Sequence, residues 1–485
     1  MPLLLPLLVP VVVALSVLAF SHAGRATRFA LAGGCLEILL LINVAWRVHQ
    51  QTAIRAGAYF RADGLTSLFL MSLAFVFFVT LLYSVSYLRH VPKGRFSSPR
   101  WFYCLLFLFL FTMLAVYLSE NLGLLWITME GTTLASALLV GFYNTEGAVE
   151  AGWKYLIVCT VGIAFALFGT IALYLAAVRS GIPSAAALNW TSLIQSAQAL
   201  GQRVPNLVKL AFLFVAVGYG TKIGFVPMHS WLPDAHAEAP SPISAMLSAA
   251  LLNCAMYALL RYDAITVHAI GPGFSHTMLL IFGALSLIGA SLLMMVQRDL
   301  KRLLAYSSVE HMGMVATGIG IGVPLGVYGA LLHSFNHSAA KSLLFFAAGN
   351  VRENFGTLRL DKITGMARSM RWTSIFLAAG VLAIIGMPPF SLFISEFAIL
   401  NAAFAQENHV MVTVVLLAIV VGFGALIFQL QRMLSGEGSL EKAAIVTRTE
   451  IAAMGLCACA VLGLGVHLPV AFIEMIHRAM AVLSS

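Results

Sequence analysis

Charged residues are scarce in this sequence: Asp, Glu, Lys and Arg together make up only 10% of its 485 residues. A water-soluble domain carries about 25% charged residues. Hydrophobic residues account for 60% of the chain, more than so little polar surface could shield from water. The composition excludes a cytosolic enzyme, a secreted disulfide scaffold and a disordered chain, and it predicts an integral membrane protein.

Cysteine is also rare, and its six copies form no C-x-x-C motif. All six lie in apolar segments, where cysteine serves as a small packing residue, so no metal or iron–sulfur site is expected. The glycine-rich run at 318–324 lacks the strand–turn–helix context of a nucleotide site. We therefore expect no cofactor in this chain. The excess Lys and Arg form no basic stripe, and no nucleic-acid partner is expected.

Fourteen apolar runs are each long enough to cross a bilayer as a helix, which predicts an all-α polytopic fold. No basic residues precede the first run, so it is expected to be a retained helix rather than a signal peptide. The runs cover residues 3–20, 29–46, 65–88, 101–118, 121–142, 152–178, 207–229, 242–260, 275–296, 302–322, 325–348, 373–403, 410–431 and 451–473.

The basic residues predict an orientation when alternate connections are placed on opposite faces of the membrane. Of the 28 Lys and Arg residues, 18 fall on one face. The richer face is expected to be cytoplasmic, which places both termini on the outer, periplasmic side of a bacterial inner membrane. Lys222 and Lys341 fall inside the runs, and the poorer face holds the other eight: Arg47, Arg55, Arg61, Arg179, Arg203, Lys209, Arg261 and Arg478.

Two apolar runs combine a charged residue with a helix-breaking proline. Lys222 is followed by Gly224 and Pro227, so the seventh helix should break just after the lysine. Pro388 and Pro389 should break the twelfth helix about two turns before Glu396. Broken helices at the membrane midplane are typical of transporters built from inverted repeats.

Further ionisable residues lie inside the runs, where each is costly unless it faces an internal polar path. Glu130 lies near the middle of the fifth helix, either as part of such a path or as a structural carboxylate bonded to a neighbouring Ser or Thr. For Lys222 the alternative is a structural ion pair with Glu130. His333, His337 and Lys341 recur every four residues and therefore share one helix face. This stripe fits a proton relay, although hydrogen bonding between helices is an alternative. The histidine pair also has the spacing of zinc ligands, but no third ligand is evident.

Three secondary candidates accompany this stripe. Glu310 and His311 are adjacent, so they should point in different directions, and one of them is expected to join the polar interior. His229 lies near Asp234 and His236 in a segment interpreted as an interfacial loop with solvated polar groups. Glu37 is a weaker candidate for the polar path, because a peripheral structural role is equally compatible with its position.

Two long motifs carry a family resemblance. They are K-I-G-F-V-P-M-H-S-W-L-P-D-A-H-A-E-A-P-S-P-I-S-A-M-L-S at 222–248 and D-L-K-R-L-L-A-Y-S-S-V-E-H-M-G at 299–313. Over about residues 100 to 430 the chain resembles the antiporter-like subunits of respiratory complex I, group 4 membrane-bound hydrogenases and Mrp-type cation/proton antiporters. Within that family it looks most like the hydrogenase-4 component F branch.

The resemblance implies fourteen transmembrane helices with two inverted five-helix repeats, helices 4–8 and 9–13, and broken helices 7 and 12. It divides the chain into N-terminal helices (1–100), an antiporter-like core (101–431) and a C-terminal loop and helix (432–485). It also implies a central axis of buried charges. The matching positions are Glu130, Lys222, Lys341 and Glu396, whereas Asn253 stands where several relatives have Lys or His.

The predicted function is proton translocation by a membrane subunit that holds no redox cofactor. A partner's conformational change would alter the Glu130–Lys222 pairing, and the proton would pass along Lys341 and the histidines to Glu396. The expected partners are other membrane subunits, a peripheral redox arm and the lipid bilayer. Two alternatives remain: a subunit of an Mrp-type cation/proton antiporter and a non-conducting anchor for a peripheral enzyme.

Overall fold

The computed structural model describes residues 2–89, 97–436 and 446–484, and most of this part of the chain is helical. Its only named strands are the short antiparallel hairpin β1 (Ala53–Ala56) and β2 (Phe60–Asp63). A helix satisfies its own backbone hydrogen bonds, which is why long apolar runs take this form in a bilayer. Each of the fourteen expected runs overlaps a helix.

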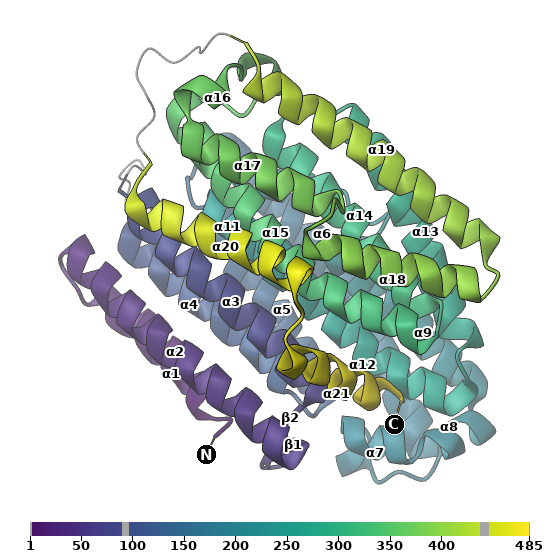
Figure 1. Cartoon of the computed structure of the whole chain (residues 1–485). Coiled ribbons are helices and arrows are strands. Elements are labelled where there is room, and N and C mark those ends of the chain that lie inside the picture. Colours follow the sequence, from purple (N-terminus) through teal and green to yellow (C-terminus); the bar gives the residue numbers. More distant parts are fainter. Residues whose placement is uncertain (1, 90–96, 437–445, 485) are drawn as a thin grey trace.

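The helices are arranged in one bundle (Figure 1). The first six are α1 (Leu5–Leu18), α2 (Ala23–Gln51), α3 (Gly64–Tyr87), α4 (Pro99–Leu118), α5 (Leu122–Val140) and α6 (Glu146–Arg179). The central part holds α7 (Trp190–Gln195), α8 (Ala197–Arg203), α9 (Pro205–Ile223), α10 (Leu232–Glu238), α11 (Ser241–Met246), α12 (Leu252–Ile270) and α13 (Gly273–Met295). The rest are α14 (Leu300–Gly320), α15 (Pro324–Phe355), α16 (Met366–Ser369), α17 (Arg371–Ile384), α18 (Ser391–Ala405), α19 (His409–Leu434), α20 (Arg448–Val466) and α21 (Val470–Ser484).

Ten helices of the described chain are long and apolar enough to cross a membrane on their own, with α11 and α12 counted as one continuous span. Three further apolar helices, α1, α17 and α18, are shorter than a full span. The protein is therefore an all-α polytopic membrane protein, while the number fourteen stays a prediction.

The order in which neighbouring helices pack occurs twice along the chain. In the first half α4 packs on α5, α5 on α6, and α6 on α9. In the second half α13 packs on α14, α14 on α15, and α15 on α18. This repetition matches the two five-helix units expected from the family resemblance, and it places a broken helix at the same point of each unit.

Both broken helices lie where the prolines predicted them. α9 ends at Ile223, one residue after Lys222, and Gly224 continues in the left-handed conformation with φ +87°. The helical course resumes in α10 at Leu232. In the second unit α17 ends at Ile384 and α18 begins at Ser391.

Burial separates a central helix from a lipid-facing rim. Every residue of the most apolar window of the α11–α12 span is buried, whereas only 33% of the corresponding window of α19 is buried. The α11–α12 span also contains a π-helical turn at Leu247–Leu251, a distortion common at functional sites. Figure 1 shows both chain ends, the β-hairpin and α21 at the same end of the bundle.

Candidate functional site

Glu130 and Lys222 are joined through the hydroxyl of Thr133. The fully buried Lys222 Nζ donates to Thr133 Oγ1 at 2.7 Å, and Thr133 Oγ1 is 3.4 Å from Glu130 Oε2. Lys222 also donates to the Tyr155 hydroxyl at 2.8 Å, and Glu130 accepts a hydrogen bond of 2.7 Å from Thr160. Of the two alternatives that the sequence left open, an ion pair with Lys222 and bonding of Glu130 to a neighbouring Ser or Thr, the structure shows the second. The Thr133 hydroxyl lies between the two charges and can pass a proton in either direction.

The second buried lysine has no carboxylate as its hydrogen-bond partner. Lys341 Nζ donates to the Leu304 carbonyl oxygen at 2.7 Å and to the Ser307 hydroxyl, both on α14. Its side chain is fully buried on α15. These hydrogen bonds tie Lys341 on α15 to α14 inside the bundle.

Two histidines and Glu396 form a cluster where α14, α15 and α18 meet. His311 Nδ1 and His333 Nε2 are 2.9 Å apart, and His333 Nδ1 lies 3.0 Å from the Ser395 hydroxyl. His311 Nδ1 is 4.0 Å from Glu396 Oε1. Hydrogen bonds thus join Ser395, His333 and His311, and a gap of 4.0 Å separates His311 from the Glu396 carboxylate.

A cavity of about 20 Å³ lies beside this cluster, and Glu310, His311 and Glu396 all line it. A polar cavity of this size has room for about one water molecule. The sequence predicted that only one of Glu310 and His311 would join the interior, which is wrong. Both do, because α14 is buried all along this stretch and presents both side chains to α18 and α19.

Asn253 connects the central helix to α15. Its amide nitrogen donates to Ser338 Oγ at 2.8 Å and to the Ser334 carbonyl oxygen at 3.0 Å, while its Oδ1 is buried without a partner. Among the described residues, no side-chain hydrogen bond joins the Lys222 cluster to the Lys341 cluster. A proton crossing this interval therefore needs water, for which the unpartnered Oδ1 of Asn253 is a ready hydrogen-bond acceptor.

Two further buried histidines lack partners. Neither ring nitrogen of His337 on α15 or of His236 on α10 finds a hydrogen-bond partner within the described chain. Both rings are fully buried, and His236 stacks on Phe345 with ring centroids 5.1 Å apart. The loop interpretation of His236 is wrong, because a short helix packs it against α15. Orphaned buried imidazoles usually indicate water molecules that complete their hydrogen bonds.

Three other polar residues lie outside the clusters of Lys222, Lys341 and His311. His229 is half-buried in the break after α9, and its ring approaches Tyr306 edge-on at 5.9 Å. Lys301, which the sequence placed in a connection, is fully buried and donates to the Ala239 carbonyl oxygen at 2.6 Å. Glu37 is fully buried on α2, and neither carboxylate oxygen has a partner among the described residues.

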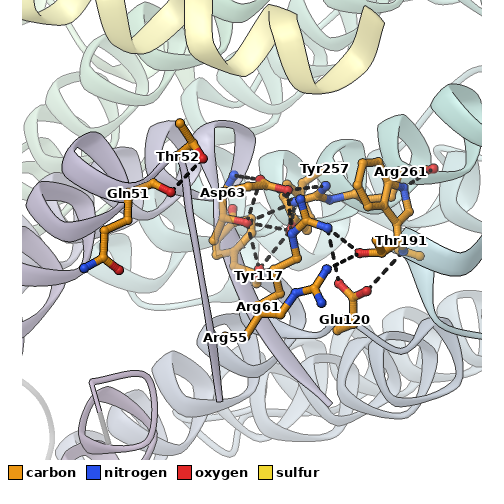
Figure 2. Close-up of polar contacts among 12 residues, drawn as sticks. Gln51, Thr52, Arg55, Arg61, Asp63, Tyr117, Glu120, Thr191, Tyr257 and Arg261 are labelled. Carbon is orange, nitrogen blue, oxygen red and sulfur yellow. Dashed lines mark hydrogen bonds and ion pairs between the residues drawn. The ribbon is translucent and has the colours of Figure 1, made fainter. Parts of the chain in front are cut away.

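A separate polar cluster lies next to the β-hairpin (Figure 2). Asp63 accepts two hydrogen bonds from Arg261, at 2.8 and 2.7 Å, and caps α3 by accepting from the Thr66 amide. Burial acts to raise the pKa of the Asp63 carboxyl, but the adjacent charges of Arg261 and Arg61 hold it below its usual value. The cluster ties the hairpin to α12, and the orientation count had placed Arg261 in an exposed connection.

The cluster of His311, His333 and Glu396 also has the composition of a metal site. One donor atom from each lies within 4.8 Å of the others, close enough for the three to hold a metal ion. His311 Nδ1 and His333 Nε2 are close enough to share a hydrogen bond, and a metal bound through these two atoms would need both of their lone pairs.

Comparisons with known proteins agree with this architecture. Residues 119–422 match the family described as NADH:quinone oxidoreductase/Mrp antiporter, TM. A hydrogenase-4 component F homolog from Methylacidiphilum infernorum is 40% identical over 390 residues, which cover 79% of this chain and 80% of the relative.

Two solved structures have the same fold. The archaeal membrane-bound sulfane sulfur reductase contains a chain that superimposes with a TM-score of 0.88 at 24% identity, covering 99% of this chain and 97% of that one. Respiratory complex I from Thermus thermophilus contains another, with a TM-score of 0.84 at 23% identity, covering 100% and 99% of the two chains.

Proposed function

Because this chain belongs to the NADH:quinone oxidoreductase/Mrp antiporter transmembrane family, we propose that it is a proton-translocating membrane subunit of a redox-driven respiratory or hydrogenase complex. Its relative among the hydrogenase-4 component F homologs favours the hydrogenase branch. Its partners are other membrane subunits and a peripheral redox arm, and its location is a bacterial inner membrane with both termini outside.

One observation carries the proposal: each unit of the fold holds a set of proton-carrying groups, with Lys222 buried and Glu130 half-buried in the first. Lys222, Thr133 and Glu130 are joined by hydrogen bonds in the first unit. In the second unit the hydrogen-bonded histidine pair lies beside Glu396. Buried groups of this kind are costly in a membrane and are typical of proton relays.

In the first unit, Thr133 transmits the proton between the charged groups. Its hydroxyl accepts from Lys222 and donates to Glu130, so one exchange along these bonds moves a proton from the ammonium group to the carboxylate. Once Glu130 is neutral, the charge that stabilised a protonated Lys222 is gone. A partner that moves α5 against α9 would control this exchange.

In the second unit, the proton reaches Lys341 through water and continues over the histidines. His311 and His333 pass it between their ring nitrogens, and Glu396 accepts it from His311, directly or through one water in the adjoining cavity. Glu396 then releases it toward the outer side. The neutral Asn253 orders water in the interval between the two lysines but carries no proton itself.

The test measures proton uptake into proteoliposomes containing the whole complex, together with its redox turnover. Replacing Lys222 by Ala or Glu396 by Gln should abolish most proton uptake per turnover while blue native gels show normal assembly. Arg298→Gln, an exposed position off the axis, is the matched control and should pump normally.

The alternatives give different results in the same assay. A non-conducting anchor would lose assembly without this chain, yet both axis variants would pump as well as the unaltered complex. A subunit of an Mrp-type antiporter would show uptake that depends on sodium and persists without redox turnover. Either result would overturn the proposal.

A further inference from the structure

A second cavity, of about 760 Å³, opens where α2, α3 and α4 meet, and none of the axis residues lines it. Its walls come from the first turns of α2, the end of α3 and the start of α4. The volume lies within the range of small-molecule binding sites. Figure 1 shows α1 and α2 at the edge of the bundle, so this region lies next to surrounding lipid.

Three arginines give the cavity a strong positive charge. Arg28, Arg89 and Arg100 line it, each from a different segment, and none of its described lining residues is acidic. Arg100 is fixed by a hydrogen bond of 3.1 Å to the Phe20 carbonyl oxygen. Within the part of the chain that the structure describes, the side-chain hydrogen bond of Arg28 goes to the Gly24 carbonyl oxygen of its own helix, at 3.4 Å. The guanidinium groups therefore retain donors for an anion, and guanidinium binds phosphate oxygens in pairs.

Two helix N-termini add to this charge. α2 begins at Ala23 and α4 at Pro99, and neither N-cap residue, His22 or Ser98, makes a side-chain hydrogen bond to its helix. The amino end of a helix carries a partial positive charge that favours anions. The Ser98 hydroxyl lines the cavity and is buried without a partner within the described chain.

Apolar side chains form the rest of the cavity wall, beside the arginines. Leu31, Val85 and Leu88 line the cavity alongside the charged residues. Further along α2, Leu36 and Leu39 are 49% and 65% exposed and form part of the lipid-facing surface. A ligand held here thus has an anionic group among arginines and apolar chains along α2, which is the shape of a phospholipid rather than of free phosphate.

We propose that this cavity is a binding site for the headgroup of an anionic phospholipid. The phosphate diester lies between Arg28, Arg89 and Arg100 at the N-termini of α2 and α4, and the acyl chains follow the outer face of α2. Basic pockets between membrane helices recognise anionic headgroups in this way. The site is independent of proton translocation, and its ligand holds α1 and α2 against α3 and α4.

The experiment uses the full chain in nanodiscs made of equal parts phosphatidylglycerol and phosphatidylcholine. Native mass spectrometry then counts the lipids retained after gentle release. The unaltered chain should retain phosphatidylglycerol in clear preference. The Arg28→Gln/Arg89→Gln variant should lose about 25-fold in that preference, because each basic residue near the surface contributes about a fivefold change. Arg100 is left intact because it also fixes the turn between α1 and α2.

The controls separate a lipid site from general charge effects. Arg25→Gln removes an exposed arginine of the same helix that does not line the cavity, and it should retain the preference. The charge-preserving Arg28→Lys/Arg89→Lys variant should retain most of it. The proposal is overturned if the double glutamine variant retains phosphatidylglycerol like the unaltered chain, or if millimolar inorganic phosphate displaces the lipid. It is also overturned if phosphatidylcholine is retained equally well.

Discussion

A hydroxyl group, rather than a direct ion pair, joins the two charged residues Lys222 and Glu130. Thr133 lies between Lys222 and Glu130, and Ser395 donates to or accepts from His333 at one end of the histidine pair. A hydroxyl can accept one proton and donate another, so it extends a relay without adding a charge to the membrane interior. Proton movement should therefore depend on neutral residues as much as on the ionisable ones.

We predict that Thr133→Val slows proton uptake about tenfold, because a hydrogen bond to a charged group contributes about 1.5–3 kcal/mol. Valine has a similar shape but removes the bridge between Lys222 and Glu130. Uptake per redox turnover in proteoliposomes measures the effect.

Thr133→Ser keeps the hydroxyl and should restore uptake. Thr170→Val, which removes a buried hydroxyl bonded to Tyr262 at 2.7 Å and lying off the axis, should leave uptake unchanged. Equal uptake in the Thr133→Val variant and the unaltered chain would show that Thr133 plays no part in the relay.

At the scale of whole elements, a glycine in each broken helix packs its backbone turn against a side chain, and at the break between α17 and α18 that side chain is Glu396. Gly386, in the break between α17 and α18, has φ +67°, and a Cβ there would collide with the Glu396 carboxylate. The break thus creates the space that Glu396 occupies. The corresponding Gly224 has φ +87°, and a Cβ there would lie 2.5 Å from Leu232 Cδ1.

Gly386→Ala should therefore displace Glu396 and reduce proton uptake while every ionisable residue remains present. The left-handed backbone adds a loss of stability of about 1–2 kcal/mol. Gly356→Ala provides the matched control, since Gly356 has φ +68° with no atom within 4 Å of its Cβ position. Both variants should melt at lower temperature, but only Gly386→Ala should lose uptake. Equal uptake in both would contradict this role of the break.

The sequence predicted elements better than contacts. Prolines located both breaks to within a few residues, and the spacing of His333, His337 and Lys341 assigned them to one helix face. The partners of these side chains depend on other helices, and spacing within one helix says nothing about them. His311 on α14 contacts His333 on α15 because these two helices pack against each other. A neighbouring Ser or Thr was already one alternative for the partner of Glu130, and the position of Thr133 three residues later, one turn along the same helix face, would have identified it.

His236 and Arg261 were misplaced for the same reason. Both lie near the ends of apolar runs, where a polar residue normally reaches water. The structure buries His236 against Phe345 and pairs Arg261 with Asp63 from a hairpin almost 200 residues earlier. Only the tertiary fold supplies such partners, so composition and hydropathy alone assign these residues to the surface.

For the whole molecule, the asymmetry of its basic residues predicts which face lies in the cytoplasm, and with it the direction of the proposed proton movement. The connection between α13 and α14 contains the exposed Arg298, on the face rich in Lys and Arg. The connection between α18 and α19 contains the exposed Gln406, on the opposite face. Loops rich in Lys and Arg remain in the cytoplasm during insertion, so this distribution predicts that Glu396 releases its proton on the outer side.

We predict that Gln406→Cys reacts with a membrane-impermeant maleimide in intact cells, whereas Arg298→Cys reacts only after the membrane is permeabilised. The unaltered chain measures background labelling, because Cys35 and Cys459 are exposed on helices α2 and α20. The reverse labelling pattern would show that the chain has the opposite orientation in the membrane. Glu396 would then release its proton on the cytoplasmic side. Because the same buried groups would carry the proton in either orientation, this measurement decides direction independently of the relay variants.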